Sequence, residues 1–397
     1  MSAQFLTLTI TAACCSYAMA SLQSSAVEKL AAFYGYRADS HDVVTTDGYI
    51  LTMHRLSKPQ AHNSSSHNTP VLVGHALLTS SEVWMFREDE NLPLQLVDHG
   101  FDVWLANFRG SHYGVKHKTL SPKSHEFWDF SWHENGILDQ AAMIDYVLNA
   151  TGRARLFALS FSMSCSATMV LLSERPEYNA KIIANVFFGP AGFFKNPAGL
   201  HRMAKVVMET FPAFTNRLKD VTGEHAINDK MPFSDVSLTT ICPATKRNAI
   251  FAPVCRMLSD FFAGKNSYLG SDKLLRALTI RFPSGASIRQ CAHFAQSIER
   301  DGEFRKYDFG RARNVELYGS PDPPSYNLKA ITSPTLIFCG LADVTVSFMD
   351  CSAVSKAVHS TVAFYEIPQY NHFSFIIGNG LEERVNKKVI AFFLSFL

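Results

Sequence analysis

Residues 156–172 read LFALSFSMSCSATMVLL, and this stretch decides how the chain can fold. It opens with a short apolar run, places four serines within seven residues, and continues with apolar residues at helical spacing. Such a pattern predicts a buried strand, a sharp turn and a helix. Enzymes that place a nucleophilic serine on such a turn commonly carry G-x-S-x-G, and here the same frame reads S-F-S-M-S. Ser162, at the centre of that frame, is therefore the candidate nucleophile.

Apolar runs with strand character alternate with helical patterns on both sides of this stretch. The strand-like runs cover residues 70–78, 101–110, 181–191, 333–343 and 361–372. Helical spacing of apolar residues follows in 137–152 and again at the C-terminus. Because strands in such an order are buried on both faces, the pattern predicts an α/β fold with a mostly parallel central sheet and helices on both faces.

The alternation is interrupted in the middle of the chain. Residues 192–326 are rich in helical patterns, Met, Phe and Pro, which predicts a helical cap inserted into the α/β core. We therefore expect a first part of the core in residues 21–191 and a second part in residues 327–397. We expect residues 1–20 to be a separate leader.

The composition limits the classes of function. The 397 residues are 47% hydrophobic with a net charge of +2, so a large core is available and no basic stripe for nucleic acid occurs. After the N-terminal segment, no run reaches the roughly 18 apolar residues of a membrane span. Phosphate- and dinucleotide-binding glycine motifs are missing, and the histidines of residues 112–133 lack metal-ligand spacing. We expect neither a cofactor nor a metal.

The N-terminus has the features of a secretory signal peptide. A short apolar run is followed by Ala18-Met19-Ala20, which predicts cleavage after residue 20. No Lys or Arg precedes the run, and a buried N-terminal helix is the alternative interpretation. The sequons at Asn63 and Asn149 fit the secretory route as glycosylation candidates.

Eight cysteines are present, of which two fall in the leader. The remaining six can oxidise in a secreted chain, although spacing alone does not determine the pairing. Cys242 and Cys255 are close in sequence and bracket a polar loop, so they are the best candidates for a disulfide. Cys165 and Cys339 lie in apolar runs, and we expect both to be buried thiols.

Three residue types suited to ester hydrolysis follow predicted strands. Ser162, Asp343 and His372 occur in the chain order of the α/β-hydrolases, and reactive groups collect at the carboxyl ends of parallel strands. His372 can take the serine proton, while Asp343 can orient the imidazole. The backbone N–H of Met163 and one from the loop after residues 70–78 are expected to bind the oxyanion.

Several blocks resemble the animal acid lipases, the family of lysosomal acid lipase and gastric lipase. The similarity runs from FYGYRADSHDVVTTDGYILTMHRL (33–56) to near the C-terminus, and includes HALL (75–78), HKTLSPKSHEFWDFSWHE (117–134) and QYNH (369–372). The resemblance implies the α/β-hydrolase fold and hydrolysis of triacylglycerols or sterol esters at a lipid–water interface. We expect a monomer that is secreted or lysosomal.

The resemblance also assigns residues to roles. It aligns Ser162 with the family's nucleophile, Asp343 with its charge-relay aspartate and His372 with its catalytic histidine. The oxyanion amides align with Leu77 and Met163.

Two departures from the family pattern leave a second interpretation open. Ser160 and Ser164 replace the glycines of GHSQG, which is expected to crowd the turn, and Phe161 replaces its histidine. The first hypothesis is an active lipase. The second is a catalytically weak or inactive lipid-binding relative, and the third is an α/β hydrolase acting on another ester or amide.

Overall fold

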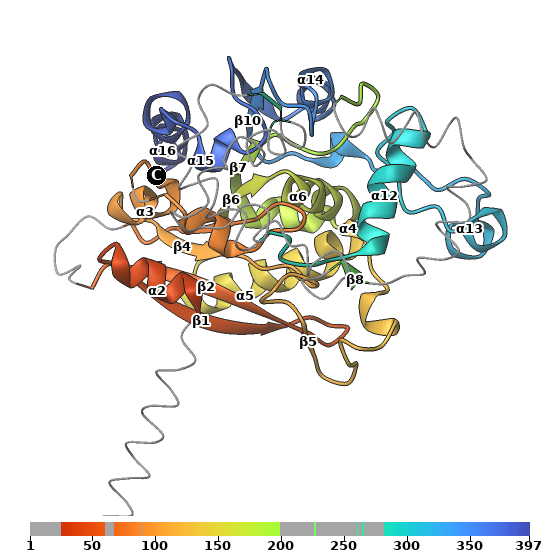
Figure 1. Cartoon of the computed structure of the whole chain (residues 1–397), viewed down its shortest axis with the longest axis horizontal. Coiled ribbons are helices and arrows are strands. Elements are labelled where there is room, and N and C mark those ends of the chain that lie inside the picture. Colours follow the sequence, from red (N-terminus) through yellow and green to blue (C-terminus); the bar gives the residue numbers. More distant parts are fainter. Residues whose placement is uncertain are drawn as a thin grey trace, which may run out of the picture.

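A nine-stranded sheet forms the centre of the fold (Figure 1). The computed structural model describes residues 25–59, 67–87, 89–198 and 282–397, together with 226–227, 260 and 264–265. Along the sheet the strand order is β1-β2-β4-β3-β6-β7-β10-β11, with β5 paired to β2. The strands are β1 (Arg37–Val44), β2 (Tyr49–Ser57), β3 (Pro70–Val73), β4 (Asp102–Leu105), β5 (Lys116–His117), β6 (Leu156–Phe161), β7 (Ile182–Phe188), β10 (Thr335–Gly340) and β11 (Thr361–Ile367).

The centre of the sheet is parallel, and one edge is antiparallel. Strands β4, β3, β6, β7, β10 and β11 run parallel, whereas β1 and β2 form an antiparallel pair at one edge. Every residue of β3, β4, β6 and β10 is buried, because helices cover both faces there. The predicted fold class, a mostly parallel sheet with helices on both faces, is confirmed.

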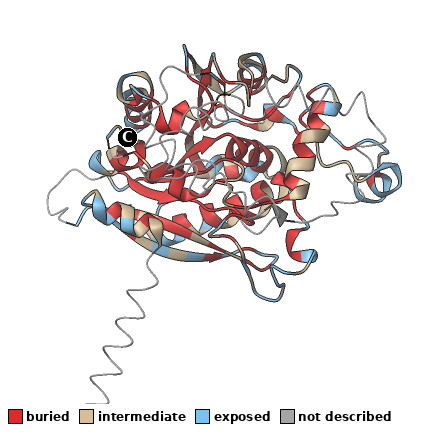
Figure 2. Cartoon of the chain, in the orientation of Figure 1, coloured by how far each residue is buried: buried red, intermediate tan, exposed pale blue. Residues whose placement is uncertain are grey.

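Helices pack on the two faces as separate layers (Figures 1 and 2). One core cluster joins the sheet to α5, α6 and α14, and the other joins it to α2, α3 and α16. The described helices are α2 (Ala26–Phe33), α3 (Leu92–Asp98), α4 (Trp132–Glu134), α5 (Ala141–Thr151), α6 (Met163–Glu174), α12 (Ile288–Glu299), α13 (Arg311–Tyr318), α14 (Phe348–Ala357), α15 (Ser374–Ile377) and α16 (Lys387–Leu394).

Local sequence signals account for several helix boundaries. The predicted helix at 137–152 begins earlier than expected, as α4, and runs through a π-helical segment, Asn135–Gln140, into α5. Ser131 and Glu134 form a capping box at its start, and Gly152 ends it with a φ of 67°, a conformation that glycine adopts without strain. Helix α6 begins one residue after Ser162, as the opening stretch predicts.

The described part of the predicted cap contains α12 and α13. In α12, His293 stacks on the Trp132 ring with centroids 3.6 Å apart, and Phe294 packs on the same ring at 5.5 Å. A short antiparallel pair joins β8 (Ala226–Ile227) to β9 (Ala286–Ser287). Most of the cap and all of residues 1–20 lie outside the described residues, so the domain boundaries stay a prediction. Across the helices that the structure describes, none has the length and apolar character needed to span a membrane.

Candidate active site

Ser162 occupies a strained turn between β6 and α6. Its backbone angles are φ 57° and ψ −116°, a region that non-glycine residues rarely enter and that costs about 1–3 kcal/mol. The backbone is held there because Ser162 N–H donates to Phe188 O at 2.9 Å and Cys165 N–H donates to Ser162 O at 2.9 Å. The turn directs the hydroxyl out of the end of the sheet, where a strand-to-helix elbow would present a nucleophile.

Loops after β10 and β11 bring Asp343 and His372 to the same end of the sheet. His372 Nε2 lies 2.8 Å from Ser162 Oγ, and His372 Nδ1 lies 2.7 Å from Asp343 Oδ2. The three side chains, here called the candidate triad, belong to residues that are 3–6% exposed. The structure thus joins side chains that are 210 and 29 positions apart in sequence into one hydrogen-bonded chain.

The orientation of Asp343 is fixed by its own loop. Its second oxygen, Oδ1, accepts from the backbone N–H groups of Thr345 and Val346, both at 2.9 Å. This leaves Oδ2 directed at the imidazole. With Nδ1–H of His372 donating to Oδ2, Nε2 is free to accept the serine hydroxyl proton.

Of the two predicted oxyanion amides, that of Met163 directly follows the serine in the chain. Met163 is the first residue of α6, and Leu77 lies in the loop after β3. Within the described residues, neither N–H donates to a backbone or side-chain acceptor. Leu78, with a φ of 62°, turns the loop, and its carbonyl accepts from Ser284 N–H at 2.7 Å.

The two elbow serines are accommodated without positive φ angles. Ser160 Oγ lies 2.9 Å from Thr168 Oγ1, and Ser164 Oγ accepts from Phe161 N–H at 2.7 Å. A Cβ atom added to Gly74 would lie 2.6 Å from Ser164 Cβ, so the missing side chain at 74 makes room for the serine. The crowding expected at position 164 is therefore relieved by a glycine on the neighbouring segment.

Phe161 contacts the histidine of the candidate triad. Its ring centroid lies 4.9 Å from that of His372, at an interplanar angle of 34°. The side chain is buried, and it presents an apolar face to the imidazole.

One cysteine prediction is wrong. Cys339 is not a free thiol, because it forms a disulfide with Cys351 across a Cα–Cα distance of 6.0 Å. The bond joins β10 to α14, whose packing against the sheet brings the two cysteines together. Cys165 is a buried free thiol, as predicted. The candidate pair Cys242 and Cys255 lies outside the described residues.

Of the two glycosylation candidates, only Asn149 is among the described residues. Asn63 lies outside the described residues. Asn149 is exposed near the end of α5, where an acceptor side chain is accessible. No group of three or more metal-ligating side chains occurs among the described residues.

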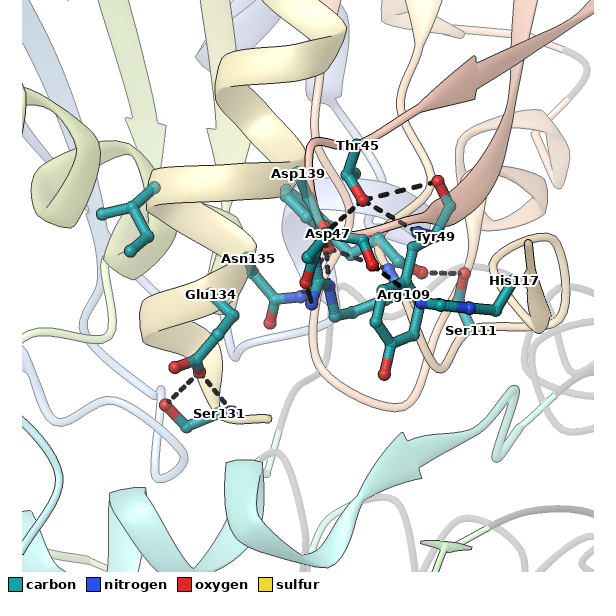
Figure 3. A network of polar contacts seen from close by, with 12 residues as sticks. Thr45, Asp47, Tyr49, Arg109, Ser111, His117, Ser131, Glu134, Asn135 and Asp139 are labelled. Atoms are coloured by element: carbon teal, nitrogen blue, oxygen red, sulfur yellow. Dashed lines mark hydrogen bonds and ion pairs between the residues drawn. The ribbon is translucent and has the colours of Figure 1, made fainter. Parts of the chain in front are cut away.

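A second buried polar cluster was missed by the sequence reasoning (Figure 3). Arg109, 2% exposed, donates from Nε to Asp139 at 2.7 Å and from its terminal nitrogens to Asp47 at 2.6 and 3.0 Å. Asn135 donates to Asp139 at 2.9 Å, and the guanidinium lies 3.9 Å from the Tyr49 ring centroid. These five residues are called the Arg109 cluster below. Burial raises the pKa of the Asp139 carboxyl.

Comparisons with known proteins identify the family of the chain. Residues 69–378 match the family described as alpha/beta hydrolase fold, and residues 27–88 match a partial alpha/beta-hydrolase lipase region. Lipase 1 of Drosophila melanogaster is 33% identical over 370 residues, 92% of this chain and 78% of that relative. Lipase member N of Homo sapiens is 30% identical over 367 residues, 92% of this chain and 89% of that relative.

A further human relative is more distant. Lysosomal acid lipase/cholesteryl ester hydrolase of Homo sapiens is 28% identical over 370 residues, 92% of this chain and 89% of that relative. The family match covers more than half of the chain, and the Drosophila relative exceeds 30% identity over most of both sequences. The chain therefore belongs to the animal acid lipase family of α/β hydrolases, which are carboxylic ester hydrolases.

Proposed function

We propose that the protein hydrolyses neutral lipid esters through an acyl-enzyme on Ser162. The observation that carries this proposal is the continuous hydrogen-bonded chain from Asp343 through His372 to the Ser162 hydroxyl. A serine hydroxyl is a weak nucleophile until a base takes its proton, and His372 Nε2 lies within reach to do so. Asp343 holds the imidazole in the required tautomer and stabilises the imidazolium that forms.

Acylation begins when Ser162 Oγ attacks the ester carbonyl carbon as His372 takes the hydroxyl proton. The carbonyl oxygen becomes an oxyanion, which the backbone N–H groups of Leu77 and Met163 stabilise. The tetrahedral intermediate then collapses. Its C–O bond to the alcohol breaks, and the imidazolium returns the proton to the departing alkoxide.

Deacylation repeats these steps with water. His372 takes a proton from water, the hydroxide attacks the acyl carbonyl, and Ser162 Oγ leaves with the proton from His372. The products are a fatty acid and an alcohol, and no cofactor takes part. The serine, the base and the orienting carboxylate are thus regenerated together.

The proposed substrates are triacylglycerols or sterol esters at a lipid–water interface. The support is the lipase relatives, one of which carries cholesteryl ester hydrolase in its name. The apolar ring of Phe161 beside His372 suits a lipid ester better than a charged substrate. We further propose that the protein works as a monomer in the secretory pathway or lysosome, as a glycoprotein with a cleaved leader.

A soluble short-chain p-nitrophenyl ester tests the nucleophile. Ser162→Ala should lower kcat by at least about 10³-fold, because it removes the hydroxyl on which the proposed acyl-enzyme forms. Ser160→Ala is a matched control, since its Oγ bonds Thr168 and not the base. Its kcat should stay within a few fold of wild type. Equal rates for wild type and Ser162→Ala would reject Ser162 as the nucleophile.

A covalent label and an emulsion assay separate the active lipase from an inactive lipid-binding relative. A fluorophosphonate should add to the peptide containing Ser162, and emulsified triacylglycerol or sterol ester should be cleaved. Tight lipid binding with no cleavage and no labelling would favour the inactive relative. Cleavage of soluble esters alone would favour a hydrolase acting on another ester.

A further inference from the structure

The peptide between Ala76 and Leu77 has its carbonyl held by three donors from its own loop. Ala76 O lies 2.8 Å from His75 Nδ1, and accepts from Thr79 Oγ1 at 2.8 Å and Thr79 N–H at 3.3 Å. In a planar trans peptide the C=O and N–H groups point in opposite directions. The three contacts on Ala76 O therefore also determine where the N–H of Leu77 points.

Both ring nitrogens of His75 are used, which assigns its tautomer. Nε2 accepts from Phe108 N–H at 3.1 Å, so the proton lies on Nδ1 and is donated to Ala76 O. The ring packs against the Phe108 ring at 5.2 Å and is buried. Burial lowers the pKa of His75 to about 4, so the ring is neutral at the pH where this hydrogen-bond pattern applies.

We propose that His75 and Thr79 are positioning residues that orient and polarise the Leu77 N–H for the oxyanion. This inference rests on the proposed function, in which Leu77 N–H stabilises the tetrahedral intermediate. Neither side chain touches the substrate, and both act through the Ala76–Leu77 peptide.

Two physical effects follow from donors on Ala76 O. Hydrogen bonds to a carbonyl strengthen the N–H of the same peptide as a donor, because chains of hydrogen bonds polarise one another. They also oppose rotation of the peptide plane. A rotated peptide would direct the Ala76 carbonyl at the developing negative charge, replacing attraction with repulsion. The amide is thus prepared before the reaction begins, which is what an oxyanion site requires.

Thr79 offers a matched pair of variants. Thr79→Val keeps the shape of the side chain and removes the hydroxyl, whereas Thr79→Ser keeps the hydroxyl. On a soluble p-nitrophenyl ester, Thr79→Val should lower kcat by about 10-fold with little change in KM, since the lost interaction acts in the transition state. Thr79→Ser should stay within about 2-fold of wild type. Equal losses in both variants would contradict the hydroxyl's role.

His75 offers a second pair that separates its two nitrogens. His75→Asn places an amide nitrogen near Nδ1 and keeps the donor to Ala76 O. His75→Gln places an amide oxygen near Nε2 and keeps only the acceptor for Phe108 N–H. We expect His75→Gln to lose more kcat than His75→Asn. The opposite order would mean that His75 supports the Phe108 loop and not the oxyanion peptide, and would overturn the proposal.

The Ki of a trifluoromethyl ketone inhibitor distinguishes a role in oxyanion binding from a purely structural role. The inhibitor forms a tetrahedral adduct with an oxyanion, so its Ki in Thr79→Val should rise by the same factor by which kcat/KM falls. Active sites are counted by complete fluorophosphonate labelling, which normalises kcat to folded protein. A lower kcat with an unchanged inhibitor Ki would overturn the proposal.

The same assay distinguishes this inference from the proposed function. Full activity in Ser162→Ala would remove the proposed function, and the inference with it. Inactive Ser162→Ala together with wild-type kcat and Ki in Thr79→Val and His75→Gln would overturn the inference alone.

Discussion

The candidate triad and the Arg109 cluster are both buried polar groups between elements of the same core, yet they are built differently. In the Arg109 cluster a permanent positive charge is already matched by two carboxylates, and a neighbouring amide binds one of them. In the candidate triad one carboxylate faces a histidine whose other nitrogen meets only a neutral hydroxyl. The triad can therefore gain charge during a reaction, whereas both carboxylates of the Arg109 cluster already contact a guanidinium that keeps its proton. Burial of ionisable groups alone does not identify the site of chemistry.

The largest expected effect is a loss of kcat on substitution of a residue in the candidate triad. Asp343→Asn keeps an acceptor for the Thr345 and Val346 amides but favours the wrong imidazole tautomer, so kcat should fall by about 10⁴-fold. The free energy of unfolding should change little. Ester hydrolysis measures the change in kcat, and urea denaturation of the same preparation measures the free energy of unfolding. A kcat within 10-fold of wild type would remove Asp343 from the proposed mechanism.

The Arg109 cluster should respond in the opposite way. Arg109→Met leaves the buried Asp139 carboxylate without its cation, so the free energy of unfolding should fall by about 3–5 kcal/mol. The kcat per active site should stay within a few fold of wild type. Arg37→Met is the control, because its ion pair with Asp39 is exposed and is worth less than about 1 kcal/mol. Similar losses of stability in the two variants would contradict a special role for the buried cluster.

A smaller loss of stability is expected at Gly74, which contacts the elbow through close packing and carries no charge. Gly74→Ala puts a Cβ atom against Ser164, and overpacking of this kind costs about 1–3 kcal/mol. The double variant Gly74→Ala with Ser164→Gly should recover part of that loss. Urea denaturation of wild type, the two single variants and the double variant measures the recovery. Strictly additive losses would show that Gly74 and Ser164 do not share this space.

The smallest expected effect concerns a buried histidine outside both clusters. Burial lowers the pKa of His54 to about 4 from an ordinary 6.5, so between these values the unfolded state binds more protons than the folded state. Stability should therefore fall as the pH falls from about 6.5 to about 4, by up to about 1.4 kcal/mol per pH unit from this group. His54→Asn should reduce that slope in urea denaturation between pH 5 and 6. An unchanged slope would contradict the contribution of His54 to the pH dependence of stability.

Much of the fold and of the candidate site follows from residue order. The buried strand β6, the turn at Ser162 and the helix α6 are encoded within 17 residues, and the strand-then-loop pattern also located Asp343 and His372. Local periodicity carries this information because it determines which residues face a core. The family resemblance supplied Leu77, whose position in an irregular loop has no periodic signal.

Other features depend on which strands become neighbours. Gly74 faces Ser164 because β3 and β6 pair in the sheet, although their sequences are far apart. The disulfide of Cys339 cannot be predicted from its apolar run, because the run indicates burial and does not show that Cys351 lies within bonding distance. The antiparallel edge of β1 and β2 was likewise not predicted from periodicity.

Residue order alone predicts a mostly parallel α/β sheet, a serine at a strand-to-helix turn, and the chain order of serine, aspartate and histidine. The assembled fold is needed to show that these side chains form one hydrogen-bonded chain and that Arg109 contacts carboxylates 62 and 30 residues away in sequence. The physical reason is that local patterns reflect burial and backbone preference over a few residues. Charge pairing, close packing and hydrogen-bond direction depend on distances that exist only once the sheet has assembled.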